Sequence, residues 1–430
     1  MPVAALMSFS TKGIAVVRRA PRGLLAVVGI FVSLVIASTP IQAHKLRVAF
    51  YYGAHPPVRT LRAFQWIVVQ PNVTFSPREF DNAHNLAFAY TSAGEVSDAA
   101  GAPSGCILGH DTDWHSAILS EAKSVCRHYY LHQVFAPLWK KGYRGFFLDN
   151  LDSYEQVVKS AKGRQLERQG LIRLISEIKA AHPHALLILN RGFQILPSVH
   201  KLVAAVTAES LFYGWNQQTH EYNRVSKATR RRLIQKLKSA QDMGLPTIAI
   251  DYLPPKERAR AQADALQIEH LNITPWITNH SLTMVGVGSI TVMPRKILML
   301  YSGPQDPQHT SLNWYAAMPL NYLGYSTHIV NIAQGLPSGT LTGQYAGIVT
   351  WFENNHVPHS TALYAWLRRQ IHNGVPIAVL GSFGFPLNRH NLKALGITAG
   401  PAPRHLDPNR IVSADPYYVG FETHALPAGR

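Results

Sequence analysis

The chain has 430 residues, a formal net charge of +17 and two cysteines. Its positive charge is scattered, and the densest cluster, Arg230-Arg231-Arg232, falls in an amphipathic segment, so the basic and aromatic pattern of a nucleic-acid-binding module is missing. The 21 histidines form no HExxH arrangement and the cysteines no CxxC arrangement. The sequence therefore supports neither a metal centre nor a cofactor.

Residues 1–43 have the pattern of a secretory signal peptide. Basic residues come first, without an acidic residue, and an apolar run over 24–37 follows that is short for a membrane span. We predict cleavage after Ala43, a periplasmic or secreted mature protein, and no stable membrane span after cleavage. An uncleaved N-terminal anchor is the alternative. Without the four Lys and Arg residues of this leader, the net charge falls from +17 to about +13.

Eight short runs rich in β-branched or aromatic residues follow, and they read as strands. They span residues 46–53, 66–71, 86–96, 145–154, 185–192, 201–210, 246–253 and 274–279. Helical spacing lies between several of them, most clearly over 165–182, 221–244 and 256–272. Strands that alternate with helices predict a parallel sheet, and eight units over roughly 250 residues favour a (β/α)8 TIM barrel, here residues 44–285.

The two cysteines, Cys106 and Cys126, fall in the long connection between the third and fourth predicted strands. In an exported protein, two cysteines in one loop can close a disulfide, which stabilises the fold by roughly 3 kcal/mol for a loop of this length. We predict this disulfide, with free thiols as the alternative.

A second α/β pattern begins at Lys296, after a stretch of weak periodicity over 280–295. Strands are predicted over 296–302, 326–331, 346–351 and 376–381, with a helix over 360–373. Residues 295–430 are therefore predicted to form a small three-layer α/β domain, flavodoxin-like or amidotransferase-like, which is either complete or incomplete in this chain. It has no phosphate-binding glycine fingerprint, and the part after Ala399 reads as irregular.

Two carboxylates stand out because each ends an apolar predicted strand. Asp149 ends the fourth strand and Glu209 the sixth, and the carboxyl ends of barrel strands meet at one mouth. Glycosidic hydrolysis needs two carboxyl groups facing one another across the bond. We assign Glu209 as the acid/base, because burial raises a carboxyl pKa, and Asp149 as the nucleophile.

Other polar residues near the strand ends are candidates for the same mouth. Asp152 is the rival nucleophile, since a register error of one residue changes which carboxylate points inward; otherwise it caps the turn that follows. The residues expected to bind substrate are Tyr51, Tyr52, Glu95, Asn190, Arg191, Asp251 and Tyr252. The aromatic rings suit stacking on a sugar, and the polar groups suit its hydroxyls.

Six motifs in order resemble glycoside hydrolase family 114, the endo-α-1,4-polygalactosaminidase group, with a likeness to the hydrolase region of the Pel polysaccharide biosynthesis protein of bacterial biofilms. They are Phe50-Tyr-Tyr-Gly53, residues 86–95, 145–152 and 189–192, Ala208-Glu-Ser-Leu-Phe212 and Ile250-Asp-Tyr252, all within 44–280. The resemblance implies a TIM barrel that cleaves α-1,4 linkages in polymers of galactosamine and N-acetylgalactosamine. It places an Asp after the fourth strand and a Glu after the sixth, which match Asp149 (or Asp152) and Glu209.

The resemblance also bears on what surrounds the barrel. In Pel-type proteins an α/β domain and then a deacetylase with metal-binding Asp and His motifs follow the hydrolase, whereas this sequence has no such motif up to Arg430. Either the chain is truncated or the partner activity lies elsewhere. The expected partners are an amino-sugar polysaccharide and exopolysaccharide export proteins.

Two further considerations apply to the substrate. A partly deacetylated galactosamine polymer is cationic, so a basic protein repels it at long range, while acids at the mouth attract it within a Debye length of about 8 Å. The acids expected there are Glu95, Asp149, Asp152, Glu209 and Asp251. The alternative function is a periplasmic polysaccharide-binding component without catalysis, which would not need both carboxylates.

Overall fold

The structure of the protein is a computed structural model that describes residues 46–82, 84–97, 102–112 and 114–397. The predicted signal peptide and the segment after Ala399 lie outside the described residues. No helix in the described part combines the length and the apolar character needed to cross a membrane.

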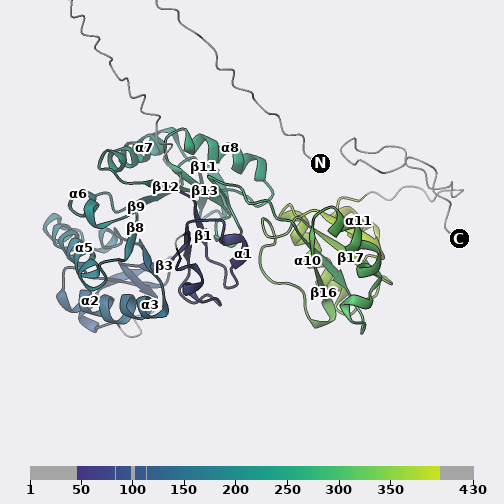
Figure 1. Cartoon of the computed structure of the whole chain (residues 1–430). Coiled ribbons are helices and arrows are strands. Elements are labelled where there is room, and N and C mark those ends of the chain that lie inside the picture. Colours follow the sequence, from purple (N-terminus) through teal and green to yellow (C-terminus); the bar gives the residue numbers. More distant parts are fainter. Residues whose placement is uncertain (1–45, 83, 98–101, 113, 398–430) are drawn as a thin grey trace, which may run out of the picture. The chain divides into compact units, whose positions relative to one another are not determined.

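The first part of the described chain is a barrel of parallel strands with helices outside it (Figure 1). In chain order the strands are β1 (Val48–Tyr51), β2 (Trp66–Val69), β3 (Leu86–Ser92), β7 (Gly145–Asp149), β8 (Leu186–Asn190), β9 (Ala205–Glu209), β12 (Thr247–Tyr252) and β13 (Thr274–Thr278). Each pairs in parallel with the next, in this same order. The prediction of a (β/α)8 barrel is confirmed.

The barrel closes where β13 meets β1. The indole nitrogen of Trp276 donates to the carbonyl of Phe50 at 3.1 Å, and the Tyr52 amide donates to the carbonyl of Leu282 at 2.7 Å. A short antiparallel strand, β14 (Val287–Gly288), extends the sheet beyond β13. The last strand is therefore tied to the first, as a barrel requires.

The connections between the strands differ in length and content. They contain α1 (Val58–Leu61), η1 (Pro77–Phe80), α2 (Ser124–Tyr129), η3 (Tyr130–Phe135), α3 (Ala136–Lys141), α4 (Tyr154–Val157), α5 (Ala161–Ala181), α6 (Leu196–Val199), η4 (His200–Leu202), α7 (Lys227–Asp242) and α8 (Arg258–Glu269). The long helices α5, α7 and α8 lie outside β8, β9, β12 and β13 (Figure 1). The first two units have only the short α1 and η1, whereas α2, η3 and α3 follow one another without a break over 124–141, so the helical ring is uneven.

Two predicted elements differ from the observed ones. The helix predicted over 221–244 begins only at Lys227, because the Ser226 hydroxyl caps it by accepting from the Thr229 amide at 3.1 Å. The residues before it form β11 (Glu221–Arg224), which pairs with β10 (Tyr213–Asn216) in an antiparallel hairpin. The strand predicted over 86–96 is interrupted at Gly94, where a Cβ would lie 2.1 Å from the Asn150 carbonyl oxygen.

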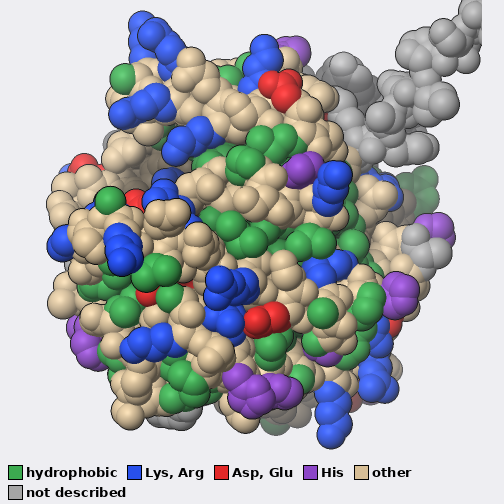
Figure 2. All heavy atoms as spheres, turned by 90° about the vertical axis from the view of Figure 1, so that its left-hand side faces the viewer, with side chains coloured by type: hydrophobic (Ala, Val, Ile, Leu, Met, Phe, Trp, Pro, Cys, Tyr) green, Lys and Arg blue, Asp and Glu red, His purple; other side chains and the backbone are tan. Residues whose placement is uncertain are grey.

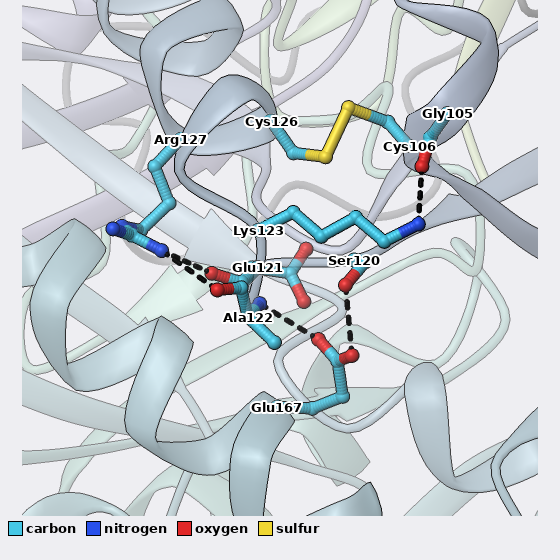
Figure 3. Close-up of a disulfide and its surroundings, with 9 residues drawn as sticks. All are labelled: Gly105, Cys106, Ser120, Glu121, Ala122, Lys123, Cys126, Arg127 and Glu167. Atoms are coloured by element: carbon cyan, nitrogen blue, oxygen red, sulfur yellow. Dashed lines mark hydrogen bonds between the residues drawn. A yellow bond between two sulfur atoms is a disulfide. The ribbon is translucent and has the colours of Figure 1, made fainter.

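The connection between β3 and β7 forms a small antiparallel sheet in the order β4-β6-β5. Its strands are β4 (Glu95–Ser97), β5 (Ile107–Asp111) and β6 (Ser116–Leu119), and η2 (Ser104–Cys106) precedes β5. A disulfide joins Cys106 to Cys126, with the Cα atoms 5.5 Å apart (Figure 3). The disulfide therefore ties α2 to the segment that leads into β5. Beside the disulfide, Arg127 donates to the backbone carbonyls of Glu121 and Ala122 (Figure 3).

The barrel interior is aromatic below its mouth. Phe50, Phe147 and Trp276 are fully buried, and the Phe50 and Phe147 rings meet edge to face with centroids 5.2 Å apart. Gly145 lies on β7 where a Cβ would be 2.3 Å from the Phe88 ring, so glycine is needed for the close approach of β3. This packed floor excludes water beneath the strand ends.

The second part of the described chain has a parallel four-stranded sheet in the order β16-β15-β17-β18. The strands are β15 (Lys296–Tyr301), β16 (Ser326–Asn331), β17 (Gly347–Phe352) and β18 (Ile377–Gly381), and the other elements are η5 (Pro307–His309), η6 (Asn313–Ala317), α9 (Met318–Tyr322), η7 (Ile332–Gln334), α10 (Ser360–His372) and α11 (Arg389–Ala394). It is an α/β unit in which strands and helices alternate as predicted. Its first strand, β15, lies between its second strand, β16, and its third strand, β17. This is the beginning of a flavodoxin-like order.

Positive charge on the surface is dispersed. On the face that Figure 2 shows, Lys and Arg side chains are spread singly or in small groups among neutral residues. Such spacing is typical of solvated helix faces.

Candidate active site

Three neighbouring strands, β7, β8 and β9, end in polar residues that meet at one point. Their last residues are Asp149, Asn190 and Glu209. In each case the next residue has a left-handed backbone: φ is 60° at Asn150, 58° at Arg191 and 61° at Ser210. Non-glycine residues rarely adopt this conformation, and such strain concentrates at functional sites. The repeated reversal ends each strand at the residue that carries the polar group.

Asn190 joins the two predicted catalytic carboxylates. Its side-chain nitrogen Nδ2 donates to Asp149 Oδ1 at 2.7 Å and to Glu209 Oε1 at 2.8 Å. Those two carboxylate oxygens can therefore be no further apart than the sum of 2.7 Å and 2.8 Å. Oxygens held this close favour the carboxyl-group separation of about 5–5.5 Å in retaining glycosidases over the 6.5–9.5 Å of inverting ones.

Asp149 is held by three donors. Besides Asn190, the Tyr90 hydroxyl donates to Oδ2 at 2.9 Å and the Asn150 backbone amide donates to Oδ1 at 2.9 Å. The Asn150 side chain in turn donates to the Ser92 hydroxyl at 3.0 Å, which fixes the turn. Three donors on two oxygens restrict the orientation of the carboxylate.

Glu209 has fewer donors and a different electrostatic setting. Its Oε2 accepts from the Tyr252 hydroxyl at 2.5 Å, and its Oε1 accepts from Asn190. Burial, and then the nearby negative charge of Asp149, raise the pKa of Glu209, while Tyr252, Asn190 and Arg191 oppose the rise. A carboxyl with a raised pKa beside an ionised one is the arrangement by which glycosidases separate acid from nucleophile.

The tyrosines predicted at the end of β1 lie on opposite faces. Tyr52 contacts the site: its ring meets the Tyr90 ring edge to face with centroids 5.2 Å apart, and burial and the charges of Tyr90, Asp149 and Glu209 raise its pKa. Tyr51 is buried on β1 with the opposite parity. Since side chains alternate along a strand, Tyr51 points away from the acid pair.

Asp152 lies in the turn after β7, three residues beyond the strand end. Its side chain is exposed, and its backbone carbonyl accepts from the Glu155 amide at 2.9 Å, at the start of α4. It belongs to the turn, whereas Asp149 is the carboxylate that Asn190 holds beside Glu209. Arg191, also exposed, donates to the Glu209 backbone carbonyl at 3.4 Å and so lies beside the pair.

Two other acids expected at the mouth are turned away from it. Glu95 is buried at the start of β4, where it accepts from the hydroxyl of Ser153 and from the hydroxyl of Ser116 at 2.6 Å. It is therefore used to fasten the small antiparallel sheet to the turn after β7. Glu95 is buried with its carboxylate turned to these two serines, so its role in the structure is to hold them together.

Asp251 is fully buried one residue before the end of β12. Its carboxylate accepts from three successive backbone amides, those of Leu211 at 2.6 Å, Phe212 at 2.7 Å and Tyr213 at 2.9 Å. These amides begin two residues after Glu209, so Asp251 positions the chain that leaves the catalytic strand. Tyr252, the next residue, has the opposite parity and faces Glu209.

Asp251 also has a buried acidic neighbour, Asp264 on α8. Burial first, and then the charge and hydrogen bond of Asp251, raise the pKa of Asp264 to about 9. Neither Asp264 carboxyl oxygen accepts a hydrogen bond from a donor in the described part of the chain. With its pKa raised to about 9, Asp264 is protonated near neutral pH and is the member of the pair that can donate to Asp251.

Some residues of the site were missed from the sequence. On β3, Tyr90 lies two residues after Phe88, so both side chains point to the same face of the strand. This alternation of side chains could have placed Tyr90 inside the barrel. At the C-terminal end of the barrel, the β10–β11 hairpin brings Trp215 onto His280 with centroids 4.0 Å apart, and Tyr222 bonds His280 through its hydroxyl at 3.1 Å. The second strand of this hairpin, β11, lies in the segment 221–244 that was predicted to be helical.

The comparisons agree with this geometry. A model of glycoside-hydrolase family GH114 matches residues 37–298, more than half of the chain. The chain belongs to this family. It is therefore a glycoside hydrolase, and the resemblance seen in the six motifs is confirmed.

Two solved structures illustrate the GH114 likeness. The glycoside hydrolase domain of PelA from Pseudomonas aeruginosa is 31% identical, with a TM-score of 0.52, over 56% of this chain and 97% of that chain. Ega3 from Aspergillus fumigatus, solved in complex with galactosamine, is 17% identical, with a TM-score of 0.43, over 55% of this chain and 92% of that chain. The comparison with curated proteins finds no match.

The side chains of this GH114 site include the two carboxyl groups that acid-assisted hydrolysis requires. Among the described residues there is no group of three or more His, Cys, Asp or Glu side chains arranged to hold a metal ion. Asp149 and Glu209 supply the two carboxyl groups, and Asn190, Tyr90 and Tyr252 orient them. The arrangement suits acid-assisted displacement at an anomeric carbon.

Proposed function

We propose that the protein is an exported hydrolase that cleaves α-1,4 linkages within galactosamine- and N-acetylgalactosamine-rich polysaccharide. Glu209 is the acid/base and Asp149 the nucleophile. The observation that carries the proposal is the single amide nitrogen of Asn190 bound to both carboxylates, which sets their spacing. The six motifs that resemble the endo-α-1,4-polygalactosaminidase group support the choice of sugar and linkage.

The reaction proceeds in two displacements with net retention. Asp149 attacks the anomeric carbon while Glu209 gives its proton to the leaving glycosidic oxygen, so the C–O bond to the departing chain breaks as a glycosyl ester forms on Asp149. The ionised Glu209 then takes a proton from a water molecule. That water attacks the anomeric carbon, the ester breaks, and Asp149 is released as a carboxylate with Glu209 protonated again.

The hydrogen bonds support these roles rather than the reverse. Asp149 accepts from Tyr90, Asn150 and Asn190, three donors that hold its carboxylate in one orientation. Glu209 has two side-chain donors, and its raised pKa leaves it protonated over a wider pH range. The nucleophile needs the first property and the general acid the second.

The charge of the site supports a cationic substrate at short range. Asp149, Glu209 and the exposed Asp152 lie at or near the end of β7 and β9, whereas the positive charge of the chain is dispersed. Within a Debye length of about 8 Å the carboxylates of Asp149 and Asp152 attract an ammonium group. A polymer of protonated amino sugars is therefore attracted once it reaches the mouth.

Cleavage of a defined polymer tests the activity. Purified protein is incubated with α-1,4-linked galactosamine polymer, fully and partly N-acetylated, from pH 4 to 8, and product lengths are followed by mass spectrometry. We expect internal cleavage to oligosaccharides. Release of single sugars only contradicts the proposal, and so does a polymer that is not shortened at any of these pH values. A protein that binds the polymer without shortening it is instead the non-catalytic binding component.

The stereochemistry and the export are tested separately. Proton NMR at early times is expected to detect the α-anomer of the new reducing end first, because two displacements restore the configuration; the β-anomer first means inversion. For export, the mature protein recovered outside the cytoplasm is expected to begin at His44. A first residue within 1–43 contradicts cleavage after Ala43.

A further inference from the structure

The second sheet has a hollow at the carboxyl ends of its strands. The chain passes from β15 to β16 on one side and from β16 to β17 on the other, so the strand order reverses between β15 and β17. In open parallel sheets, ligands bind outside the carboxyl ends of the strands at such a point. A hollow of about 210 Å³ lies there, lined by residues that include Tyr301 and Ser302 after β15 and Trp351 and Glu353 after β17.

The lining combines one carboxylate with aromatic surface. Glu353 is exposed, accepts only from the Ser311 hydroxyl at 3.4 Å, and forms no ion pair with the described residues. Trp314, also in the lining, is 55% exposed, and the Trp351 ring is stacked by the Tyr315 ring with centroids 5.7 Å apart. Large aromatic side chains left this accessible on a folded domain mark a binding surface.

The charges exclude one class of ligand and favour another. Of the described residues that line the hollow, none is Lys or Arg, and the one histidine, His309, lies with its Nδ1 3.9 Å from the Asp306 carboxylate. Glu353 would repel a phosphate or a nucleotide. A carboxylate beside aromatic rings suits an organic cation, because the carboxylate pairs with the charge and the rings attract it through their faces. A protonated amino sugar offers an ammonium group and an apolar ring face together.

The volume sets the size of the ligand. Sites for drug-sized molecules have volumes of about 300–1,000 Å³, so a hollow of about 210 Å³ accommodates a smaller unit such as one sugar ring. A second hollow of about 590 Å³ shares Tyr301 and Gln305 with the first and extends over the end of β16 to Asn331. The neighbouring sugars of a chain have room there.

We propose that this hollow is a non-catalytic binding site for one protonated galactosamine unit of the polysaccharide. The identity of the sugar rests on the proposed function of the barrel. The ammonium group pairs with Glu353, and the sugar ring stacks on Trp314. A site of this kind raises the local concentration of polymer for the barrel, since the second binding event on a long chain is intramolecular.

The test measures binding without cleavage. The full chain carrying Glu209→Gln is titrated with an α-1,4-linked galactosamine hexasaccharide by calorimetry, and Glu353→Gln and Trp314→Ala are each added to this background. We expect each added change to weaken one class of binding site by roughly tenfold or more, as loss of a charge pair or a stacking face implies. Tyr322→Ala is the matched control, because it removes a 91% exposed aromatic ring from α9 outside the lining.

The outcomes separate this site from the barrel. Unchanged binding of the hexasaccharide by both Glu353→Gln and Trp314→Ala overturns the proposal. The proposal is also overturned if Glu353→Gln binds inorganic phosphate more tightly while its affinity for the hexasaccharide stays the same. The N-acetylated hexasaccharide is expected to bind this site roughly tenfold more weakly, since it carries no ammonium group. If the wild-type chain cleaves no polymer yet Glu353-dependent binding persists, the proposed activity fails and this site stands.

Discussion

The Tyr252 hydroxyl donates to Glu209 Oε2 at 2.5 Å, from the strand next to the one that carries the glutamate. The bond favours the ionised carboxylate and so opposes burial and the charge of Asp149, which raise the pKa of Glu209. Tyr252 thus sets how far the acid's pKa rises and fixes the direction in which its proton is delivered.

Tyr252→Phe is expected to move the pH profile of hydrolysis upward. Without the hydroxyl, the ionised form of Glu209 loses a donor, its pKa rises further, and the alkaline limb of kcat/KM shifts to higher pH. The loss of one bond to a charged group also lowers kcat by roughly tenfold, or about 1.4 kcal/mol. A pH–rate profile of the variant checks this; an alkaline limb that stays in place or moves to lower pH contradicts the role given to Tyr252.

The identity of the two catalytic carboxylates is tested by three isosteric changes. Glu209→Gln and Asp149→Asn are expected to lower hydrolysis by roughly 10²–10⁴-fold, because each removes a group that acts on the reacting bond. Asp152→Asn is the matched control, since its exposed side chain lies in the turn, and it is expected to retain near wild-type rates. Thermal unfolding is measured alongside, so that a loss of fold is not mistaken for a loss of chemistry.

A larger loss in Asp152→Asn than in Asp149→Asn assigns the nucleophile to Asp152. Retained activity in Glu209→Gln removes the acid/base from this position altogether. In either case the spacing set by Asn190 ceases to describe the catalytic pair.

Much of the barrel and its acid pair could be predicted from the sequence. Each barrel strand is a short apolar run of buried residues, and Asp149 and Glu209 stand at the last position of theirs, where the apolar pattern stops abruptly. The carboxyl ends of all barrel strands meet at one mouth, so the position in the strand is enough to bring such residues together.

The direction of individual side chains was harder to predict. Side chains alternate across a strand, so a shift of one residue moves a group from the mouth to the outer face. Tyr51 and Asp251 are one residue out of phase with Tyr52 and Tyr252, and the sequence marks both members of each pair as polar or aromatic. Only the three backbone amides that Asp251 accepts from reveal its structural role.

Contacts from outside the predicted strands were not accessible to sequence reasoning. Glu95 is fastened by Ser153 and Ser116, which lie 58 and 21 residues away along the chain. The β10–β11 hairpin has charged residues at helical spacing, yet Tyr222 pairs across it with Trp215. Tertiary pairing of this kind overrides the local pattern.

Asn190→Asp is expected to disable the site while the barrel remains folded. The change replaces the shared donor with a third carboxyl group between Asp149 and Glu209, which repels both while it is ionised and can donate to one of them only when it is protonated. Hydrolysis should fall by roughly 100-fold or more, and what remains should have its optimum at lower pH, because only the protonated form of the new carboxyl is a donor. Asn190→Ala, which removes the donor without adding charge, is the control for the pH effect.

The two Asn190 variants are compared in rate and in pH profile. Near wild-type hydrolysis in both variants contradicts the view that the amide positions the carboxylates. An identical pH profile in both means that the added carboxyl does not interact with Glu209.

The disulfide between Cys106 and Cys126 is expected to stabilise the connection between β3 and β7. Replacing both cysteines with serine should lower the free energy of unfolding by about 3 kcal/mol, as for other loops of about this length, because the unfolded chain regains freedom. Hydrolysis by the folded fraction should be largely retained, since neither sulfur contacts the acid pair. Denaturant unfolding of the wild type with and without a reductant is the control, and equal stability in the two conditions contradicts a stabilising bridge.

The buried pair Asp251 and Asp264 makes the stability of the protein depend on pH. The pKa of Asp264 in the folded state is raised to about 9 from an ordinary value of 3.8, chiefly by burial. The folded state then binds more protons than the unfolded state between these values, so the contribution to stability is complete below about pH 4 and is lost as the pH rises toward 9. Asp264→Asn keeps a donor for Asp251 at every pH and should flatten this dependence.

The expected result is a higher melting temperature for Asp264→Asn than for the wild type at pH 9, with little difference at pH 5. The reason is that only the wild type must ionise a buried carboxyl next to Asp251 as the pH rises. Asp242→Asn, an exposed aspartate at the end of α7, is the matched control and should follow the wild type throughout. If the variant and the wild type lose stability in parallel between pH 5 and 9, the two carboxyl groups do not share a proton, and the amides after Glu209 are held by Asp251 alone.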